Sequence, residues 1–224
     1  GKPQHFRHEP LKKRPKSASP YIGRPELPPA IPYVPPVRIL VGVPAQDEVK
    51  TLFLVDLVGM LQYTSAQHPD WEIGLQVVQG TYLFAQRQEL VQHALDWQAT
   101  HILWLDSDMR FPEDALIRLK AHNVSIVGTA YSTRRAPFKL SGSPDATVQA
   151  ALSHPAGLVP STFLGFGCLL TDTRIFNARG AESSANAIPY PWFAFPYDPA
   201  MGFIGEDAAF GDDREVEAFG AAGI

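Results

Sequence analysis

Two acidic residues separated by one position directly follow a short apolar segment. Residues 101–105 read His-Ile-Leu-Trp-Leu, and Asp106-Ser107-Asp108 comes next. Two carboxylates at this spacing can converge on a hard divalent cation, directly or through its water molecules, and Mg²⁺ and Mn²⁺ prefer such oxygen ligands. The pattern therefore predicts a Mn²⁺ or Mg²⁺ site at Asp106 and Asp108. The alternative is an acidic turn that only helps to cap a following helix.

The segments around this turn alternate between strand patterns and helix patterns. Helical spacing of apolar residues predicts helices at 50–67 and 83–97. Short apolar or β-branched runs predict four strands, at residues 38–43, 71–78, 101–105 and 124–129. This alternation predicts an α/β fold with a mostly parallel sheet flanked by helices. Ligands bind at the carboxyl ends of strands in such sheets, which is where the acidic turn falls.

The same patterns predict helix boundaries and helix faces. Pro112 is expected at the start of a third helix, with Glu113 and Asp114 in its first turn. Residues 206–222 are expected to form a last helix. The predicted buried face of helix 50–67 consists of Leu54, Leu57, Val58 and Leu61.

Composition narrows the class of protein. The chain has 224 residues, which suits one domain or one domain with a tail. The net charge of −4 does not point to a nucleic-acid partner. Cys168 is the single cysteine, which excludes an internal disulfide and a zinc site of the CxxC type. Because no apolar run is long enough to span a bilayer, we expect no transmembrane segment and a cytoplasmic location.

The first 36 residues differ from the rest, because they hold ten of the 21 prolines and a basic cluster at residues 12–16. Proline lacks an amide donor and disfavours a helix at the preceding residue, so residues 1–36 are expected to form an extended arm. Residues 37–224 are expected to form the α/β domain. The arm is either solvated or docks on a partner protein or a second copy through Tyr21, Ile22, Ile31, Tyr33 and Val34.

Several motifs together resemble a known family. The string LWLDSDM at 103–109, followed by Phe-Pro-Glu-Asp at 111–114, resembles the DxD region of family-two-like GT-A glycosyltransferases. Further matching segments occur in the expected order over about residues 38–223: Val41–Pro44, Arg87 in Ala-Gln-Arg-Gln, Gly128–Tyr131 with Arg134 and Arg135, Gly165–Cys168, Pro191–Phe193, and Gly205-Glu206-Asp207. The resemblance implies a GT-A fold.

The resemblance also implies an activity, namely metal-dependent transfer of a sugar from a UDP- or GDP-sugar to the hydroxyl of an unspecified acceptor, with inversion. Asp106 would contact ribose or metal-bound water, and Asp108 would bind Mn²⁺ or Mg²⁺. Asp207 would be the general base, with Glu206 orienting the acceptor or supporting it. The implied substrate-binding residues are Pro44, Arg87, Asp106, Arg134, Gly167 and Trp192.

Each of these residues also has a purely structural interpretation. Glu206 and Asp207 are compatible with an acidic first helical turn, and Arg134 with a solvated loop. Arg87 is compatible with an exposed helix position. Gly167 can permit close packing, and Trp192 can belong to the core.

Two departures from the family pattern stand out. The usual arginine-asparagine pair is Arg87-Gln88 here. The resemblance also implies a strand and a metal-binding histidine after the helix that follows Asp207, so we expect a C-terminally truncated domain.

Two other functions remain open. A GT-A-like domain can serve as a non-catalytic structural or binding module, docked in a larger assembly through its N-terminal arm. A nucleotidyltransferase has related metal chemistry, but its first loop is usually glycine-rich and basic. Residues 44–48 read Pro-Ala-Gln-Asp-Glu, which lack both features.

Overall fold

The computed structural model describes residues 36–129, 131, 158–161, 164–177, 192–193, 197–198, 202–203 and 218–221. The helices are α1 (Thr51–Gln67), α2 (Leu83–Asp96) and α3 (Ala115–Ala121). The strands are β1 (Arg38–Ala45), β2 (Glu72–Gln79), β3 (His101–Leu105), β4 (Ile126–Thr129), β5 (Leu158–Ser161), β6 (Cys168–Asp172), β7 (Tyr197–Asp198), β8 (Gly202–Phe203) and β9 (Ala218–Ala221). Residues 1–35 of the predicted arm and the predicted site residues Arg134, Glu206 and Asp207 lie outside the described residues.

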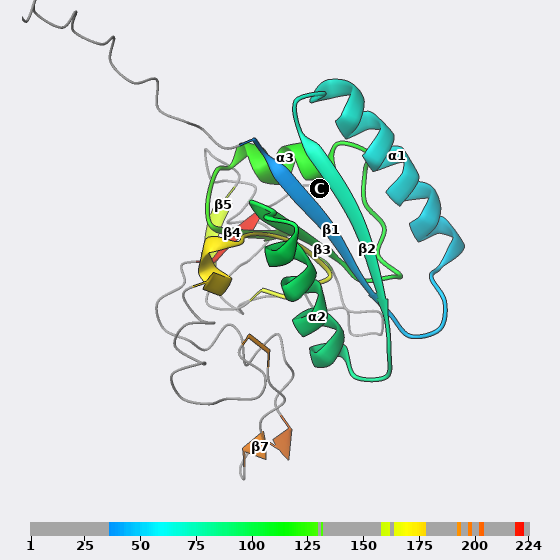
Figure 1. Ribbon diagram of the computed structural model, residues 1–224, viewed down its shortest axis with the longest axis vertical. Helices are drawn as coiled ribbons and strands as arrows, with labels where there is room; N and C mark the ends of the chain where they lie inside the picture. The colour runs from blue at the N-terminus through cyan, green and yellow to red at the C-terminus, as the bar shows by residue number, and fades with distance from the viewer. Residues whose placement is uncertain are drawn as a thin grey trace, which may run out of the picture. The chain divides into compact units, whose positions relative to one another are not determined.

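The main sheet is mixed, and five of its seven strands run in the same direction. Its order is β2-β1-β3-β6-β4-β9-β5, and β7 and β8 form a separate two-stranded sheet. β1 pairs in parallel with β2 and β3, and β4 pairs in parallel with β9. β6 lies antiparallel between β3 and β4, and β5 is antiparallel to β9. The predicted α/β class is therefore confirmed, and Figure 1 shows β2 at one edge of this sheet.

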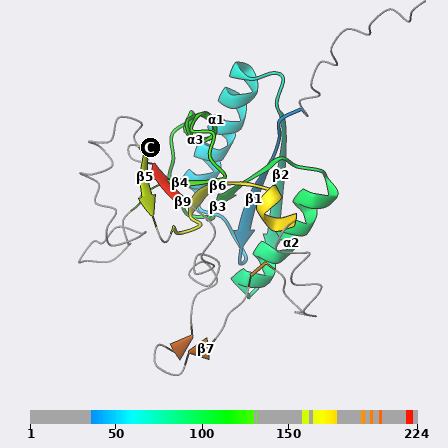
Figure 2. The ribbon, with the colours of Figure 1, turned by 90° about the vertical axis from the view of Figure 1, so that its left-hand side faces the viewer.

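Helices cover both faces of the sheet. Alternate residues of β1 point to opposite faces, as the two-residue period of a strand requires. Ile39, Val41 and Val43 pack into a core with α1 and α3, whereas Leu40 packs into a second core with α2. Figure 2, turned by 90°, shows α2 on the opposite side of the sheet from α1 and α3. The buried, β-branched strands thus explain the continuous apolar runs of the sequence.

The second core contains an aromatic cluster around Trp104. This residue is 0% exposed, and its ring makes edge contacts with Phe166, Phe176 and Phe193. Its indole N–H donates to the Thr171 hydroxyl at 3.0 Å, so the buried donor is satisfied. The cluster fixes β3, whose end carries the acidic turn, against residues 166–176.

The predicted face of α1 is wrong in part. Leu54 and Val58 are 49% and 44% exposed, and the buried residues are Phe53, Leu57, Met60 and Thr64. Apolar residues lie on more than one side of this helix. Their spacing therefore does not single out the stripe that contacts the sheet.

Two other boundaries also differ from the prediction. α3 begins at Ala115, and Pro112 accepts a hydrogen bond from the Ala115 amide in the turn before it. Residues 218–221 form strand β9, which pairs with β4 and corrects the predicted last helix there. β9 follows the Glu206-Asp207 segment in the sequence, so a strand is present where we expected a truncated domain to lack one.

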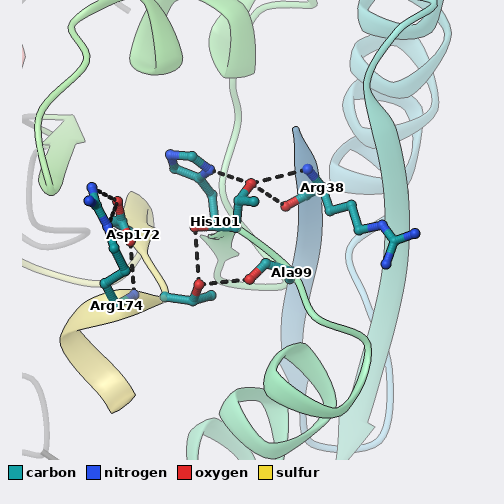
Figure 3. A network of polar contacts seen from close by, with 7 residues as sticks. Arg38, Ala99, His101, Asp172 and Arg174 are labelled. Atoms are coloured by element: carbon teal, nitrogen blue, oxygen red, sulfur yellow. Dashed lines mark hydrogen bonds and ion pairs between the residues drawn. The ribbon is translucent and has the colours of Figure 1, made fainter. Parts of the chain in front are cut away.

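A polar network closes the end of the sheet opposite the acidic turn (Figure 3). The Thr100 hydroxyl donates to the Arg38 carbonyl at 2.9 Å and contacts Nδ1 of His101 at 2.8 Å. The Thr173 hydroxyl donates to the Ala99 carbonyl at 2.7 Å. These bonds join the first residues of β1 and β3 to the end of β6, which positions β3 along its length.

We expect His101 to make folding stability fall on mild acidification. Burial, with help from Lys120, lowers the pKa of His101 from 6.5 to about 4. Between these two values the unfolded chain binds the proton more strongly, so stability decreases as the pH falls from 6.5 to 4. Urea unfolding at steps across this range measures the slope.

His101→Gln should flatten that slope. His122, whose pKa is lowered by its own desolvation, contributes in the same direction and is present in both proteins. Asp56 and Asp172 have lowered pKa values, so they add to the loss of stability at the acid end of this range, and both residues are present in both proteins. Equal slopes for the parent and His101→Gln would show that His101 binds its proton as strongly in the folded chain as in the unfolded chain.

Candidate functional site

The acidic turn is held by backbone hydrogen bonds to two other elements. The Asp106 amide donates to the Gly167 carbonyl, and the Lys50 amide donates to the Ser107 carbonyl, each at 3.0 Å. The Met109 amide donates to the Asp106 carbonyl at 3.0 Å and closes the turn itself. The start of α1 and the segment before β6 therefore fix where the two carboxylates lie.

Asp56 of α1 holds the chain that leaves the turn. Its carboxylate accepts hydrogen bonds from Nε of Arg110 at 2.5 Å and from the Phe111 amide at 3.3 Å. The hydrogen bond from Arg110 is the main reason that the pKa of Asp56 lies below its usual value. Asp56 therefore stays ionised at neutral pH and ties Arg110 and the neighbouring Phe111 to the helix.

Arg87 of α2 lies beneath the turn and contacts its first acid. Its side chain is 3% exposed, and Nη2 lies 3.3 Å from Oδ1 of Asp106, whose side chain is 29% exposed. The guanidinium also stacks over the ring of Phe166, with 4.7 Å to the centroid. Arg87 is thus a buried helix residue rather than an exposed one, and it orients Asp106. A direct contact of Arg87 with a donor remains a prediction.

Asp106 and Asp108 are both partly exposed and follow the same strand. The described residues contain no group of three or more histidine, cysteine or acidic side chains that could hold a metal ion. Two carboxylates nevertheless suit Mg²⁺ or Mn²⁺, because these cations commonly take one or two carboxylates and complete their shell with water and substrate phosphates. The donor set therefore fits a cation that binds together with a phosphorylated ligand.

Pro44 lies within β1, which ends at Ala45, two residues further than predicted, and the loop at 46–50 follows. Even-numbered residues of β1 direct their backbone amides and carbonyls toward β3, and the pairing of β1 with β3 ends at Gly42. Because Pro44 lies beyond this pairing, its missing amide hydrogen costs no hydrogen bond in the sheet. Nε2 of the Gln86 side chain donates to the carbonyls of Ala45 and Gly80, the latter at 3.0 Å. Gln86 thereby joins the loop that follows β1 to the loop that follows β2. In the family that the sequence resembles, the first of these loops holds the nucleoside.

Gly167 permits a close contact with Tyr131. The Gly167 amide donates to the Tyr131 hydroxyl at 3.1 Å, while its carbonyl accepts from Asp106. A Cβ at position 167 would lie 2.8 Å from Cζ of Tyr131. The absence of a side chain at Gly167 therefore allows Tyr131 to lie against the backbone that holds the acidic turn.

We expect Gly167→Ala to destabilise the chain by about 1–3 kcal/mol, because the new methyl group overlaps the Tyr131 ring. The loss should shrink in the double variant Gly167→Ala with Tyr131→Ala, since the second change removes the ring. Urea unfolding of the single and double variants measures this coupling. A loss that is the same with and without the ring would place the strain elsewhere.

Trp192, predicted to contact substrate, is 9% exposed in the aromatic core. Its indole N–H donates to the Phe176 carbonyl at 2.7 Å. Oε1 of Gln88 accepts from the amides of Trp192 and Phe193 at 3.2 and 3.4 Å. Gln88, which replaces the asparagine usual in the family, thus holds residues 192–193 against α2. The substrate contact of Trp192 stays a prediction.

The sequence did not assign roles to four residues that support the site: Lys50, Asp56, Gln86 and Tyr131. Their contacts join segments far apart along the chain, such as Asp56 with Arg110 and Tyr131 with Gly167. A signal existed only for Asp56, which is the single acidic residue of an otherwise apolar helix pattern. Such a residue requires a polar partner when it lies near the core.

The chain resembles solved structures at the level of its fold. No protein-family model matches it. No curated protein matches it either. A197 from STIV is 14% identical with a TM-score of 0.51 and covers 83% of this chain and 82% of that chain. The structure of GalNAc-T7 with UDP, GalNAc and Mn²⁺ is 9% identical with a TM-score of 0.46, covering 83% of this chain and 41% of that one. The 4-diphosphocytidyl-2C-methyl-D-erythritolsynthase from Anaerococcus prevotii DSM 20548 is 13% identical with a TM-score of 0.44, covering 83% and 87%.

In the part of the chain that the structure describes, no helix has the length and apolar character needed to cross a membrane.

The strand order, with parallel β2, β1 and β3 followed by antiparallel β6, leaves the acidic turn at the carboxyl end of β3. The chain therefore has the predicted α/β fold, with a mostly parallel sheet flanked by helices.

Proposed function

We propose that the chain is a metal-dependent glycosyltransferase that moves a sugar from a nucleotide-sugar donor to an acceptor hydroxyl, with inversion. One observation carries the proposal. Asp106 and Asp108 lie partly exposed at the carboxyl end of β3, and the buried Arg87 fixes the first of them from below at 3.3 Å. A charged residue buried to hold another charge in place is typical of a site that requires fixed geometry.

The two acids have different roles in this proposal. Asp108 would hold Mn²⁺ or Mg²⁺, and the cation would supply positive charge to stabilise the diphosphate leaving group. Asp106, held by Arg87, contacts the donor ribose or a water molecule on the cation. Because Nη2 of Arg87 lies 3.3 Å from Oδ1 of Asp106, the ion pair holds the direction of this carboxylate when a ligand arrives.

The loop held by Gln86 is proposed to receive the nucleoside of a UDP- or GDP-sugar. The motif positions Arg134, Gly167 and Trp192 are proposed to complete the substrate site. In the transfer step the acceptor oxygen attacks the anomeric carbon, and the bond from that carbon to the diphosphate oxygen breaks. The bonding electrons leave with the diphosphate, and Asp207 takes the acceptor proton while Glu206 orients the acceptor.

Calorimetric titration of the full chain with UDP and GDP, with and without Mn²⁺, tests this proposal. We expect one of the two nucleotides to bind, and to bind more tightly when Mn²⁺ is present. The corresponding sugar conjugates then identify the donor. If neither nucleotide nor any conjugate binds a folded sample, the transferase is excluded and the non-catalytic module becomes the better account.

A further inference from the structure

One side of the molecule presents apolar residues to solvent from two neighbouring elements. Leu75 and Val77 of β2 are 46% and 43% exposed. They lie on the same sheet face as α1, because they pair with Val41 and Val43, which pack against that helix. Large apolar residues exposed together on one face mark an interaction site more often than single scattered ones do.

Helix α1 extends this surface. On α1, Asp56 lies on one side of the row of buried residues and points toward Arg110, in the segment that follows β3. Leu54 and Val58 lie on the opposite flank, which is therefore the β2 side, and Val55 is 61% exposed. We name Leu54, Val55, Val58, Leu75 and Val77 the α1–β2 surface. Asp56 is the single charged residue of α1, and apolar residues lie on several sides of its N-terminal half. A helix surface of this kind is normally covered.

The edge of β2 is open for pairing. Within the described chain this strand pairs with β1 alone. The Glu72 amide donates to the Val37 carbonyl and the Gly80 amide to the Ala45 carbonyl, so even-numbered residues face β1. Ile73, Leu75 and Val77 therefore direct their amides and carbonyls outward. Natural edge strands usually carry lysine, proline or a bulge that prevents pairing, whereas β2 is eight residues long with neither lysine nor proline.

We propose that a second copy of this chain covers the α1–β2 surface, by antiparallel pairing of its β2 strand with this one about a two-fold axis at Leu75. In this register Leu75 lies opposite Leu75 of the second copy, and Ile73 lies opposite Val77. Apolar side chains then meet across the strands on the α1 face. The outward amides and carbonyls of these residues exchange hydrogen bonds, which displace the exposed bond from Gln76 to the Val77 carbonyl.

The charges on this surface favour a second copy over other occupants. The one charged residue of β2 is Glu72, whose carboxylate lies 2.7 Å from Arg38 of the same chain. No like charges therefore meet when two copies pair. A helix that binds an anionic membrane surface carries lysine and arginine on its polar side, and α1 has none. A two-fold contact also uses one patch twice, as closed dimers do.

Light scattering after size exclusion tests the proposal on the full chain. At concentrations on the order of 100 µM, because dimerisation follows mass action, we expect a mass twice the 24.6 kDa of one chain. Leu75→Lys with Val77→Lys should shift the mass to that of the monomer. Gln92→Lys, at an exposed position of α2, adds the same type of charge elsewhere and should leave the dimer intact. Circular dichroism confirms that each variant is folded.

Cysteine cross-linking tests the register. Leu75→Cys should form a disulfide-linked dimer under mild oxidation, because residues paired across a two-fold axis bring their Cα atoms within disulfide reach. Val77→Cys should not cross-link, since its partner in this register is Ile73. Cys168 does not interfere, because burial raises the pKa of its thiol to about 12. A monomeric parent chain, or a dimer that survives the double lysine variant, would overturn the proposal. Either result is independent of nucleotide binding.

Discussion

Asp108→Asn is expected to lower sugar transfer by about three orders of magnitude, because the cation loses the carboxylate proposed to bind it directly. The same change should abolish the Mn²⁺-dependent part of nucleotide binding. Stability should stay within about 1 kcal/mol of the parent, since the side chain is partly exposed and backbone bonds hold the turn. Calorimetry with Mn²⁺ and the nucleotide that the parent binds measures the first effect, and urea unfolding measures the second.

Glu113→Gln is the matched control for this variant. It removes one negative charge from an exposed residue five positions further along the chain. Binding should be unchanged in Glu113→Gln, because long-range effects of one exposed charge are screened by salt. If Asp108→Asn bound the nucleotide and Mn²⁺ as tightly as the parent, the assignment of the metal site to this turn would be wrong.

The sequence predicted the elements that bear the acidic turn because their patterns are local. Residues 101–105 are a strand with the predicted limits, since an apolar run ends abruptly at Asp106. The helix predicted at 83–97 is α2, Leu83–Asp96. The period of apolar residues reports secondary structure well when one face alone is apolar.

Long-range pairing could not be predicted in the same way. β6 inserts antiparallel between β3 and β4, and β9 pairs with β4 from about 90 residues further along the chain. Nothing in the local pattern of residues 218–221 specifies a neighbour in the sheet. The exposed residues of α1 were predicted to be buried for a related reason. Apolar spacing cannot tell a face that meets the sheet from one that meets solvent or a second copy.

The sequence identified the two acids of the candidate site, but it did not predict the ion pair that supports them. Asp106 and Asp108 follow one strand, so their proximity follows from the sequence alone. The ion pair of Arg87 with Asp106 joins α2 to the end of β3 and depends on how the two pack. A signal was present, because Arg87 falls among the buried residues Gln86, Leu90 and Val91 of α2. A charged residue on a buried helical face requires a partner of opposite charge.

Asp106→Asn is expected to destabilise the fold by about 2–3 kcal/mol, in contrast to Asp108→Asn. The change removes the negative charge that lies 3.3 Å from a guanidinium whose side chain is 3% exposed. Breaking a buried pair from one side is costly, because the remaining charge stays in a medium that solvates it poorly. Urea unfolding of the two asparagine variants measures the difference between two acids that are two residues apart in the same turn.

The double variant Asp106→Asn with Arg87→Met tests whether this loss comes from the charge left behind. Methionine fills much of the volume of the arginine without its charge, so the double variant should regain most of the stability that Asp106→Asn loses. Equal losses in the single and double variants would place the effect in the hydrogen bonds of the turn instead. Because Asp106 is also a proposed ligand contact, the double variant should still bind nucleotide weakly. Recovery of folding without recovery of binding would therefore separate the structural role of the Arg87–Asp106 pair from its role in the site.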